Sequence, residues 1–274
     1  MIWTLLILVL AIALYMFGGK FIKINSKKAS TLDIVMHKGI KVLAIILIAG
    51  SVCRLWTPVY LVHTNPAILQ EMVQNMQAQQ EKVKNKEVRK YVKNHMDDMI
   101  GNAPIAGNVD AKKTIFLWSD YSCPYCRRVH SELARVLSER DDVRVVLKNF
   151  SIHGALSDAP AKAVIAAKIQ DNAKAAALDK LLMDKEYFTQ EDMKNQAKLP
   201  EVIHANVMKL AKEAGLDTKQ LEADMEGDVV RKELQNVREL AQRFEITGTP
   251  YLIIKDQAYP GYIPYARIVE ALKD

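Results

Sequence analysis

The chain has 274 residues, of which 50% are hydrophobic, and its formal net charge is +6 at pH 7. This length suits one globular domain with additional segments, and the apolar content is sufficient for a buried core. Three cysteines are too few for a disulfide-stapled fold, and the sequence lacks the second pair of ligands that a structural zinc site needs.

The positive charge is concentrated near the N-terminus. Residues 20–41 contain six lysines and a single acidic residue, Asp33, whereas acids and bases mix from residue 64 onward. No aromatic-rich basic groove is apparent in the sequence. We therefore interpret the charge as a signal of membrane topology and expect no nucleic acid partner.

Two apolar stretches flank this basic loop, at residues 2–17 and 42–53. The first is at the lower end of the roughly 17–25 residues that cross a bilayer as a helix, and the second can be extended at both ends. The positive-inside rule keeps the basic loop of residues 20–41 in the cytoplasm. We therefore predict that residues 1–62 anchor the protein in a bacterial inner membrane, with the chain after residue 60 facing the periplasm.

A cleaved signal peptide is the alternative interpretation of the same region. Residues 36–41 and the apolar stretch after them resemble its charged and hydrophobic parts, and Ala49 and Ser51 are small residues suited to cleavage after Ser51. The domain would then be soluble in the periplasm. We expect the third cysteine, Cys53, to be a buried membrane residue, because the sequence around it is a poor lipoprotein signal.

A long helix is predicted for residues 66–100, within a linker over residues 63–100. A narrow apolar stripe with spacings of three and four runs along this helix on both sides of a glutamine-rich patch. The stripe favours pairing with another copy of the chain in a homo-oligomer; the alternatives are packing against the chain's own domain and a partly frayed spacer. The stripe consists of Ile68, Leu69, Met72, Val73, Met76, Val88, Val92, Met96 and Met99.

An α/β domain is predicted for residues 101–274. Its first strand, helix and strand form a βαβ unit with a parallel strand pair. A mostly helical insertion at about residues 155–243 separates this unit from a last strand and a final helix. The strands are at residues 114–119, 143–150 and 251–255, and the helices that flank the insertion are at 123–140 and 264–273.

The sequence Cys123-Pro124-Tyr125-Cys126 stands where the first strand ends and the helix begins. A helix N-terminus offers unpaired backbone N–H groups and the positive end of the helix dipole, which favour a thiolate over a thiol. We therefore expect Cys123 to be the exposed nucleophile. Cys126, one turn further along, should be the buried thiol that closes the disulfide.

Residues 116–126, which end in this motif, resemble the DsbA-like branch of the thioredoxin superfamily. Residues 247–250 (Thr-Gly-Thr-Pro) look like the cis-proline loop of that family, and the helical insertion between the two motifs is also a family feature. The region that begins with residues 65–71 and ends with residues 144–148 is similar to one subgroup of these proteins, the suppressor-of-copper-sensitivity C (ScsC) subgroup. The resemblance covers about residues 64–274.

The resemblance implies a thioredoxin fold with a helical insertion and assigns roles to four residues around the cysteines. Pro250 matches the cis-proline, whose ring faces the active-site sulfurs. Thr249 matches the residue before it, which tunes substrate release. Pro124 and Tyr125 match the dipeptide between the cysteines, which does not fix the direction of electron flow.

One position departs from the family pattern. Members often carry a buried acid six residues before the first cysteine, where it assists proton transfer at the second, but this chain has Leu117 there. The nearest acid is Asp120, which we expect to be a cap or an exposed turn residue. Proton handling at Cys126 is therefore open. We expect His130 and His153 to be surface residues rather than bases or metal ligands.

The leading hypothesis is a thiol–disulfide oxidoreductase that forms or rearranges disulfides in exported proteins through Cys123 and Cys126. A membrane redox partner, a quinone-linked oxidase or a reductase, would restore the pair after each cycle. The long helix and Thr249 favour an isomerase over an oxidase. The alternatives are a disulfide reductase and a Cu(I)-binding module, because a reduced cysteine pair is a soft metal site. We expect no cofactor and no resident metal.

Overall fold

The computed structural model describes residues 2–21, 31–64 and 66–273. The chain forms two compact units, Met1–Gln80 and Glu81–Asp274. The central part of the predicted basic loop, residues 22–30, lies outside the described residues.

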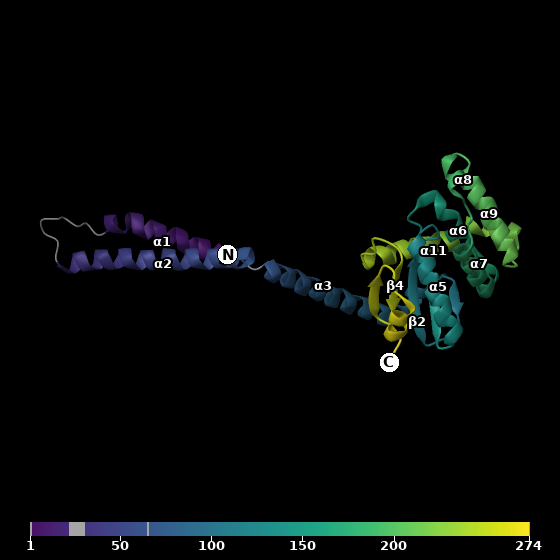
Figure 1. Ribbon diagram of the computed structural model, residues 1–274, viewed down its shortest axis with the longest axis horizontal. Coiled ribbons are helices and arrows are strands. Elements are labelled where there is room, and N and C mark those ends of the chain that lie inside the picture. The colour runs from purple at the N-terminus through teal and green to yellow at the C-terminus, as the bar shows by residue number, and fades with distance from the viewer. Residues whose placement is uncertain (1, 22–30, 65, 274) are drawn as a thin grey trace. The chain divides into compact units, whose positions relative to one another are not determined.

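The first unit is built on two helices, α1 (Ile2–Phe21) and α2 (Thr31–Thr64), which lie side by side (Figure 1). Ala11 and Ala44 are only 1% exposed, and such small side chains allow two helices to approach closely. Within the described residues, no helix combines the length and the apolar content needed to cross a membrane. The anchor over residues 1–62 stays a prediction.

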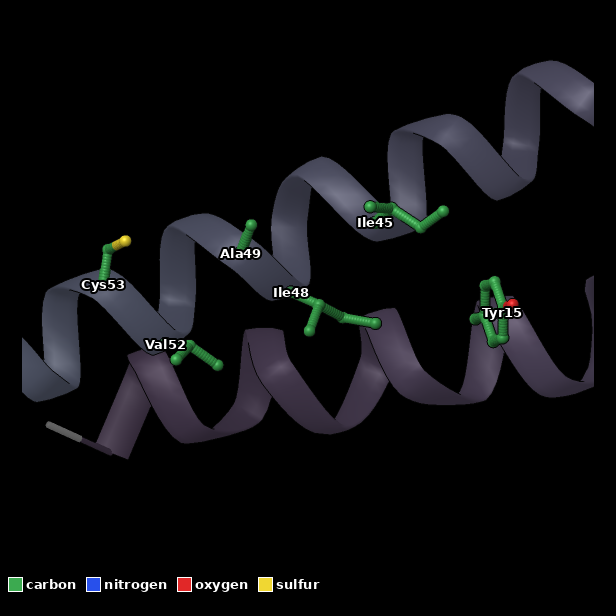
Figure 2. A pocket seen from close by; sticks show the side chains of 6 residues that line it. All are labelled: Tyr15, Ile45, Ile48, Ala49, Val52 and Cys53. Carbon is green, nitrogen blue, oxygen red and sulfur yellow. The ribbon is translucent and has the colours of Figure 1, made fainter.

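An apolar hollow lies between these two helices. Figure 2 shows Ile48 and Val52 of α2 pointing toward α1, where Tyr15 lines the same hollow. The Cys53 side chain points away from α1 in this view and is exposed. Cys53 is nevertheless one of the residues that line the hollow, and its predicted place in a membrane stays a prediction.

The predicted long helix is divided in the structure into α3 (Pro66–Asn94) and the short α4 (Met96–Ile100). Its apolar stripe has two different environments. Before residue 81 most of the stripe is about half exposed or more, as at Met72 (52%) and Met76 (61%), and Ile68 is partly buried. From Val88 onward the stripe packs in the core of the second unit, where Val88, Val92 and Met99 are buried and Met96 is partly buried.

Residues 81–100, which the sequence analysis placed in the linker, therefore contribute to the domain. Val88 and Val92 pack in one cluster with residues of the sheet and of the C-terminal half of the chain. Polar contacts add to this packing, since Arg89 forms an ion pair with Asp256 at 2.5 Å. Asn85 Oδ1 accepts a hydrogen bond from the backbone N–H of Ala258 at 3.0 Å.

We predict that Val88→Ala lowers the free energy of unfolding of this domain by about 2 kcal/mol, because it removes two buried methyl groups and leaves a cavity. Val83 lies on the same helix but is 64% exposed, so Val83→Ala is the matched control and should change stability by less than about 0.5 kcal/mol. Denaturant unfolding of both variants measures the difference. Equal effects would show that the end of α3 is not part of the core.

The second unit contains a five-stranded sheet with the order β1-β3-β2-β4-β5. The central strands β2 and β3 are parallel, as predicted for the βαβ unit, and the other neighbouring pairs are antiparallel. The strands are β1 (Ile105–Gly107), β2 (Lys113–Ser119), β3 (Val143–Asn149), β4 (Tyr251–Ile254) and β5 (Gln257–Pro260).

Alternate side chains of the central strands point to opposite faces of the sheet. Ile115 and Leu117 of β2 pack in one core with the helices α5 and α12. Phe116 and Trp118 of the same strand pack in another, with α11 and the end of α3. The bounds of the three flanking helices are α5 (Pro124–Glu139), α11 (Asp228–Arg243) and α12 (Tyr265–Ala271).

A helical block follows β3, as the sequence predicts (Figure 1). It begins with a 3₁₀ turn at Gly154–Leu156, and its alanine-rich first helix, α6, is buried along most of its length. Ser157 stands at the N-cap of α6 but makes no capping hydrogen bond through its side chain. The helices of the block are α6 (Asp158–Gln170), α7 (Asn172–Asp184), α8 (Gln190–Lys194), α9 (Leu199–Glu213), α10 (Thr218–Met225) and then α11.

A fully buried ion pair joins β3 to α11. Lys148 Nζ lies 2.8 Å from Glu233 Oε1, and both side chains are at most 1% exposed. The ammonium also donates to the carbonyl of Ile100 and to Asn236 Oδ1, while Glu233 Oε2 accepts from the backbone N–H of Asn102 at 2.6 Å. Burial lowers the pKa of Lys148, and the charge of Glu233 opposes this shift.

Candidate active site

The two candidate active-site cysteines lie at the start of α5, after β2. Cys123 is the N-cap residue of α5 in an extended conformation, and Pro124 occupies the first turn. Proline is well suited there, because the first helical N–H groups have no partner within the helix. The free N–H groups of this turn therefore point toward the Cys123 end of the motif.

The two cysteines differ in exposure. Cys123 is 6% exposed and Cys126 is 0% exposed, so Cys123 is the more accessible sulfur but is more deeply buried than expected for an exposed nucleophile. Burial raises the pKa of the Cys126 thiol to about 12, and a hydrogen bond from the backbone N–H of Asp120 acts against this rise. That N–H lies 3.4 Å from Cys126 Sγ. At neutral pH the Cys126 side chain is therefore a thiol.

The loop before β4 meets this helix N-terminus. The Thr249–Pro250 peptide bond is cis, as the resemblance implies. The Cys123 thiol lies 3.5 Å from the carbonyl oxygen of Thr249, as a weak donor to it. Tyr125, between the cysteines, is 55% exposed and turns its ring toward the guanidinium of Arg128. The fold thus brings both predicted motifs together, although they are far apart in the sequence.

Asp120 is not the exposed turn residue that the sequence analysis expected, since it is only 1% exposed. Its Oδ1 accepts hydrogen bonds from Ser122 and from the hydroxyl of Ser157 at 2.5 Å, which explains why Ser157 does not cap α6. Its Oδ2 accepts from the backbone N–H groups of Ile152 and His153. Burial alone would raise the pKa of Asp120, but these hydrogen bonds outweigh it and the pKa is lowered.

The two histidines near the site differ in environment. His153 is partly exposed, and its Nδ1 lies 3.0 Å from Asp120 Oδ2. The side chain of His130 is only 11% exposed, so the expectation of a surface residue is wrong for it. The burial of His130 could have been inferred from the sequence, because this residue follows Cys126 by four positions and therefore lies on the same face of the helix. Its main partner, Asp179, comes from the helical insertion and had no signal in the sequence.

His130 and Asp179 belong to a buried polar network beside Cys126. His130 Nε2 lies 3.1 Å from Ser119 Oγ, and His130 Nδ1 lies 3.3 Å from Asp179 Oδ2. The hydroxyl of Tyr121 donates to Asp179 Oδ1 at 2.8 Å. The side chain of Ser119 also acts against the burial that raises the pKa of the Cys126 thiol. Among the described residues, no group of three or more acidic, histidine or cysteine side chains is placed to hold a metal ion.

A family model described as thioredoxin matches residues 99–274. The chain belongs to the thioredoxin family. A search among curated proteins found no significant match. Among solved structures, the second unit is similar to a thioredoxin-like oxidoreductase from Silicibacter pomeroyi DSS-3, which is 31% identical, with a TM-score of 0.55 over 64% of this chain and 94% of the other.

Two further solved structures are similar to this chain. The catalytic domain of Proteus mirabilis ScsC is 26% identical, with a TM-score of 0.54 over 67% of this chain and 96% of that domain. The thiol–disulfide exchange protein α-DsbA2 from Wolbachia pipientis matches with a TM-score of 0.58, over 70% of this chain and 96% of the Wolbachia chain. Its sequence identity is 19%, so this match supports the fold alone. The predicted resemblance to DsbA-like proteins and to ScsC is confirmed.

Proposed function

We propose that this thioredoxin-family protein is a thiol–disulfide oxidoreductase that works through Cys123 and Cys126. The observation that carries the proposal is the placement of the Cys123 sulfur at the N-terminus of α5, 3.5 Å from the carbonyl of Thr249. Cys126 lies one turn behind it and is fully buried. This arrangement gives one accessible sulfur for exchange and one protected sulfur for closing the disulfide.

In the reductive direction, the thiolate of Cys123 attacks a substrate disulfide and one substrate sulfur leaves. The thiolate of Cys126 then attacks Cys123 Sγ, the bond from Cys123 to the substrate breaks, and the second substrate sulfur leaves and takes up a proton. The cysteine pair is oxidised and the substrate disulfide is reduced by two electrons. The oxidative direction is the reverse. We expect the backbone of Thr249, whose peptide bond to Pro250 is cis, to pair with the substrate chain during these steps.

We further propose that the substrates are exported proteins with cysteines and that the domain faces the periplasm. The apolar stretches and the basic loop within residues 1–62 support retention at the inner membrane, next to a redox partner that restores the pair. The half-exposed stripe on the first part of α3 supports self-association, which an isomerase would use to combine active sites. Protease accessibility in intact spheroplasts would test the orientation, since a cytoplasmic domain would be protected.

The function is tested by equilibrating the full-length protein, carrying Cys53→Ser, with a glutathione redox series. We expect a reversible Cys123–Cys126 disulfide with a reduction potential well above the value of thioredoxin, which is about −270 mV. The variant Cys126→Ser is the control and should form no internal disulfide. A potential near that of thioredoxin would indicate a reductase. The complete absence of a reversible disulfide would overturn the proposal and favour the Cu(I)-binding alternative.

A further inference from the structure

The chemistry of Cys126 requires a proton acceptor that the known motifs do not supply. The thiol of Cys126 is 0% exposed, so bulk water cannot take its proton directly. Leu117, at the position where related proteins often carry an acid, has no group that titrates. The carboxylate of Asp120 is close, but the serine hydroxyls and backbone N–H groups described above already occupy both of its oxygens.

Ser119, His130 and Asp179 form a continuous chain of polar contacts beside this thiol. The hydroxyl of Ser119 lies 3.1 Å from His130 Nε2, and the same side chain acts against the burial that raises the pKa of Cys126. The other ring nitrogen of His130 faces Asp179 Oδ2 at 3.3 Å. The three residues come from the end of β2, from α5 and from α7, so that only the folded chain assembles them.

The partners of His130 decide its tautomer. A carboxylate only accepts hydrogen bonds, so Nδ1 of His130 carries the proton that points to Asp179. In the neutral ring, Nε2 is then an acceptor, and it must receive the hydroxyl proton of Ser119. The Ser119 oxygen is left free to accept the thiol proton of Cys126. Every hydrogen bond in the chain therefore points away from the sulfur, as it must for proton removal.

Asp179 is itself held in place. The hydroxyl of Tyr121 donates to its Oδ1, and burial raises the pKa of Tyr121 well above its usual value, so this hydroxyl keeps its proton at neutral pH. Tyr121 Oη also lies 3.0 Å from Asn149 Oδ1. The Tyr121 hydroxyl has one proton to donate, and it donates this proton to the carboxylate of Asp179 rather than to Asn149, because hydrogen bonds to ionised groups are stronger.

A hollow gives this chain an outlet to solvent. His130 and Asp179 line a mostly apolar cavity of about 340 Å³, together with Lys180 and Asp184. The side chains of Lys180 and Asp184 are 66% and 47% exposed, so the cavity reaches the surface at this end. Water that enters here can exchange a proton with the imidazole without reaching the buried sulfurs.

We propose that Ser119, His130 and Asp179 form a proton relay for Cys126. This inference rests on the proposed function. When the mixed disulfide at Cys123 is resolved, the thiol proton of Cys126 passes to the Ser119 oxygen while the hydroxyl proton of Ser119 passes to His130 Nε2. The thiolate of Cys126 attacks Cys123 Sγ, the substrate leaves as a thiolate, and the imidazolium, stabilised by Asp179, loses its proton to water. In the reverse direction the imidazolium returns the proton to the departing Cys126 thiolate.

The relay is tested on the full-length protein with Cys53→Ser, using a chromogenic aryl disulfide in stopped flow. The first release of aryl thiolate reports the attack by Cys123 and depends on reagent concentration. The second release reports the attack by Cys126 and is independent of the reagent concentration. We expect His130→Gln and Ser119→Ala each to lower the ratio of the second to the first rate constant about a hundredfold at neutral pH, the lower end for general base catalysis.

The pH profile separates a relay from a merely structural role. The groups that face the His130 ring and its cavity are Ser119, Asp179, Lys180 and Asp184, and of these only Ser119 is changed, in Ser119→Ala. Without the relay, the second release should require the free Cys126 thiolate and rise about tenfold per pH unit. In the parent protein the rate of the second release should depend much less steeply on pH, because the relay removes the thiol proton. The second release in the double variant, with His130→Gln and Ser119→Ala, should be no slower than in either single variant, because both substitutions interrupt the same path.

The matched control is His204→Gln. His204 Nε2 also faces a carboxylate, Glu222 Oε1 at 3.2 Å, but on the exposed surface of the insertion. This variant should leave the ratio of rate constants unchanged. A ratio within about threefold of the parent in His130→Gln, or an unchanged pH profile, would overturn the relay. Failure of the proposed function would look different, because the parent protein itself would then show no concentration-independent second release.

Discussion

Cys123→Ser is expected to lower the rate of disulfide exchange by at least about a thousandfold, because the thiolate is the nucleophile and a serine hydroxyl stays protonated at neutral pH. The rate is measured as turnover of a fluorogenic peptide disulfide with a thiol reductant in excess. The N-terminal position of Cys123 on α5 is retained in the variant, so a change in folding should not contribute. Circular dichroism of the variant checks this point.

Cys126→Ser provides the complementary result. This variant keeps the attacking sulfur but lacks the resolving one, so it should accumulate mixed disulfides with substrate proteins that a reductant releases. Cys53→Ser is the control and should leave turnover unchanged, since Cys53 lies in the other compact unit. Full activity of Cys123→Ser would contradict the assignment of the nucleophile. If Cys123→Ser trapped substrates and Cys126→Ser did not, the roles of the two cysteines would be reversed.

The second large effect is expected at the buried ion pair. Glu233→Leu should lower the free energy of unfolding by about 3–5 kcal/mol, because it leaves the ammonium of Lys148 buried without its counter-charge. Urea unfolding at neutral pH measures this loss. The carbonyl of Ile100 and Asn236 Oδ1 remain as partners of the ammonium, so the domain should still fold.

A double-mutant cycle isolates the pair. Adding Lys148→Met to Glu233→Leu removes the uncompensated charge, so the two losses should be non-additive by at least about 1 kcal/mol. The control is the exposed pair of Glu191 and Lys194, where Glu191→Ala should change stability by less than about 0.5 kcal/mol. Additive losses at Lys148 and Glu233 would mean that the two charges do not stabilise each other in the folded state.

The sequence by itself determined the parts of this protein that are encoded in neighbouring residues. A strand followed by a capped helix start is a local signal, so the position of Cys123 at the beginning of α5 was predictable. The parallel pair of β2 and β3 followed from the short joints of the βαβ unit, and the start of the helical insertion followed from its first-turn proline, Pro160. The Thr249–Pro250 loop could be matched because it is a contiguous motif.

Only the tertiary structure decided which charged and polar residues are buried. Whether an isolated histidine or acid faces solvent depends on segments that arrive from elsewhere in the chain: His130 meets Asp179 from the insertion, and Asp120 meets the loop at Ile152. The apolar stripe of α3 has one period throughout, yet Val88 is buried and Met76 is exposed. A helical pattern specifies a face but not its partner, because burial is a property of packing between distant elements.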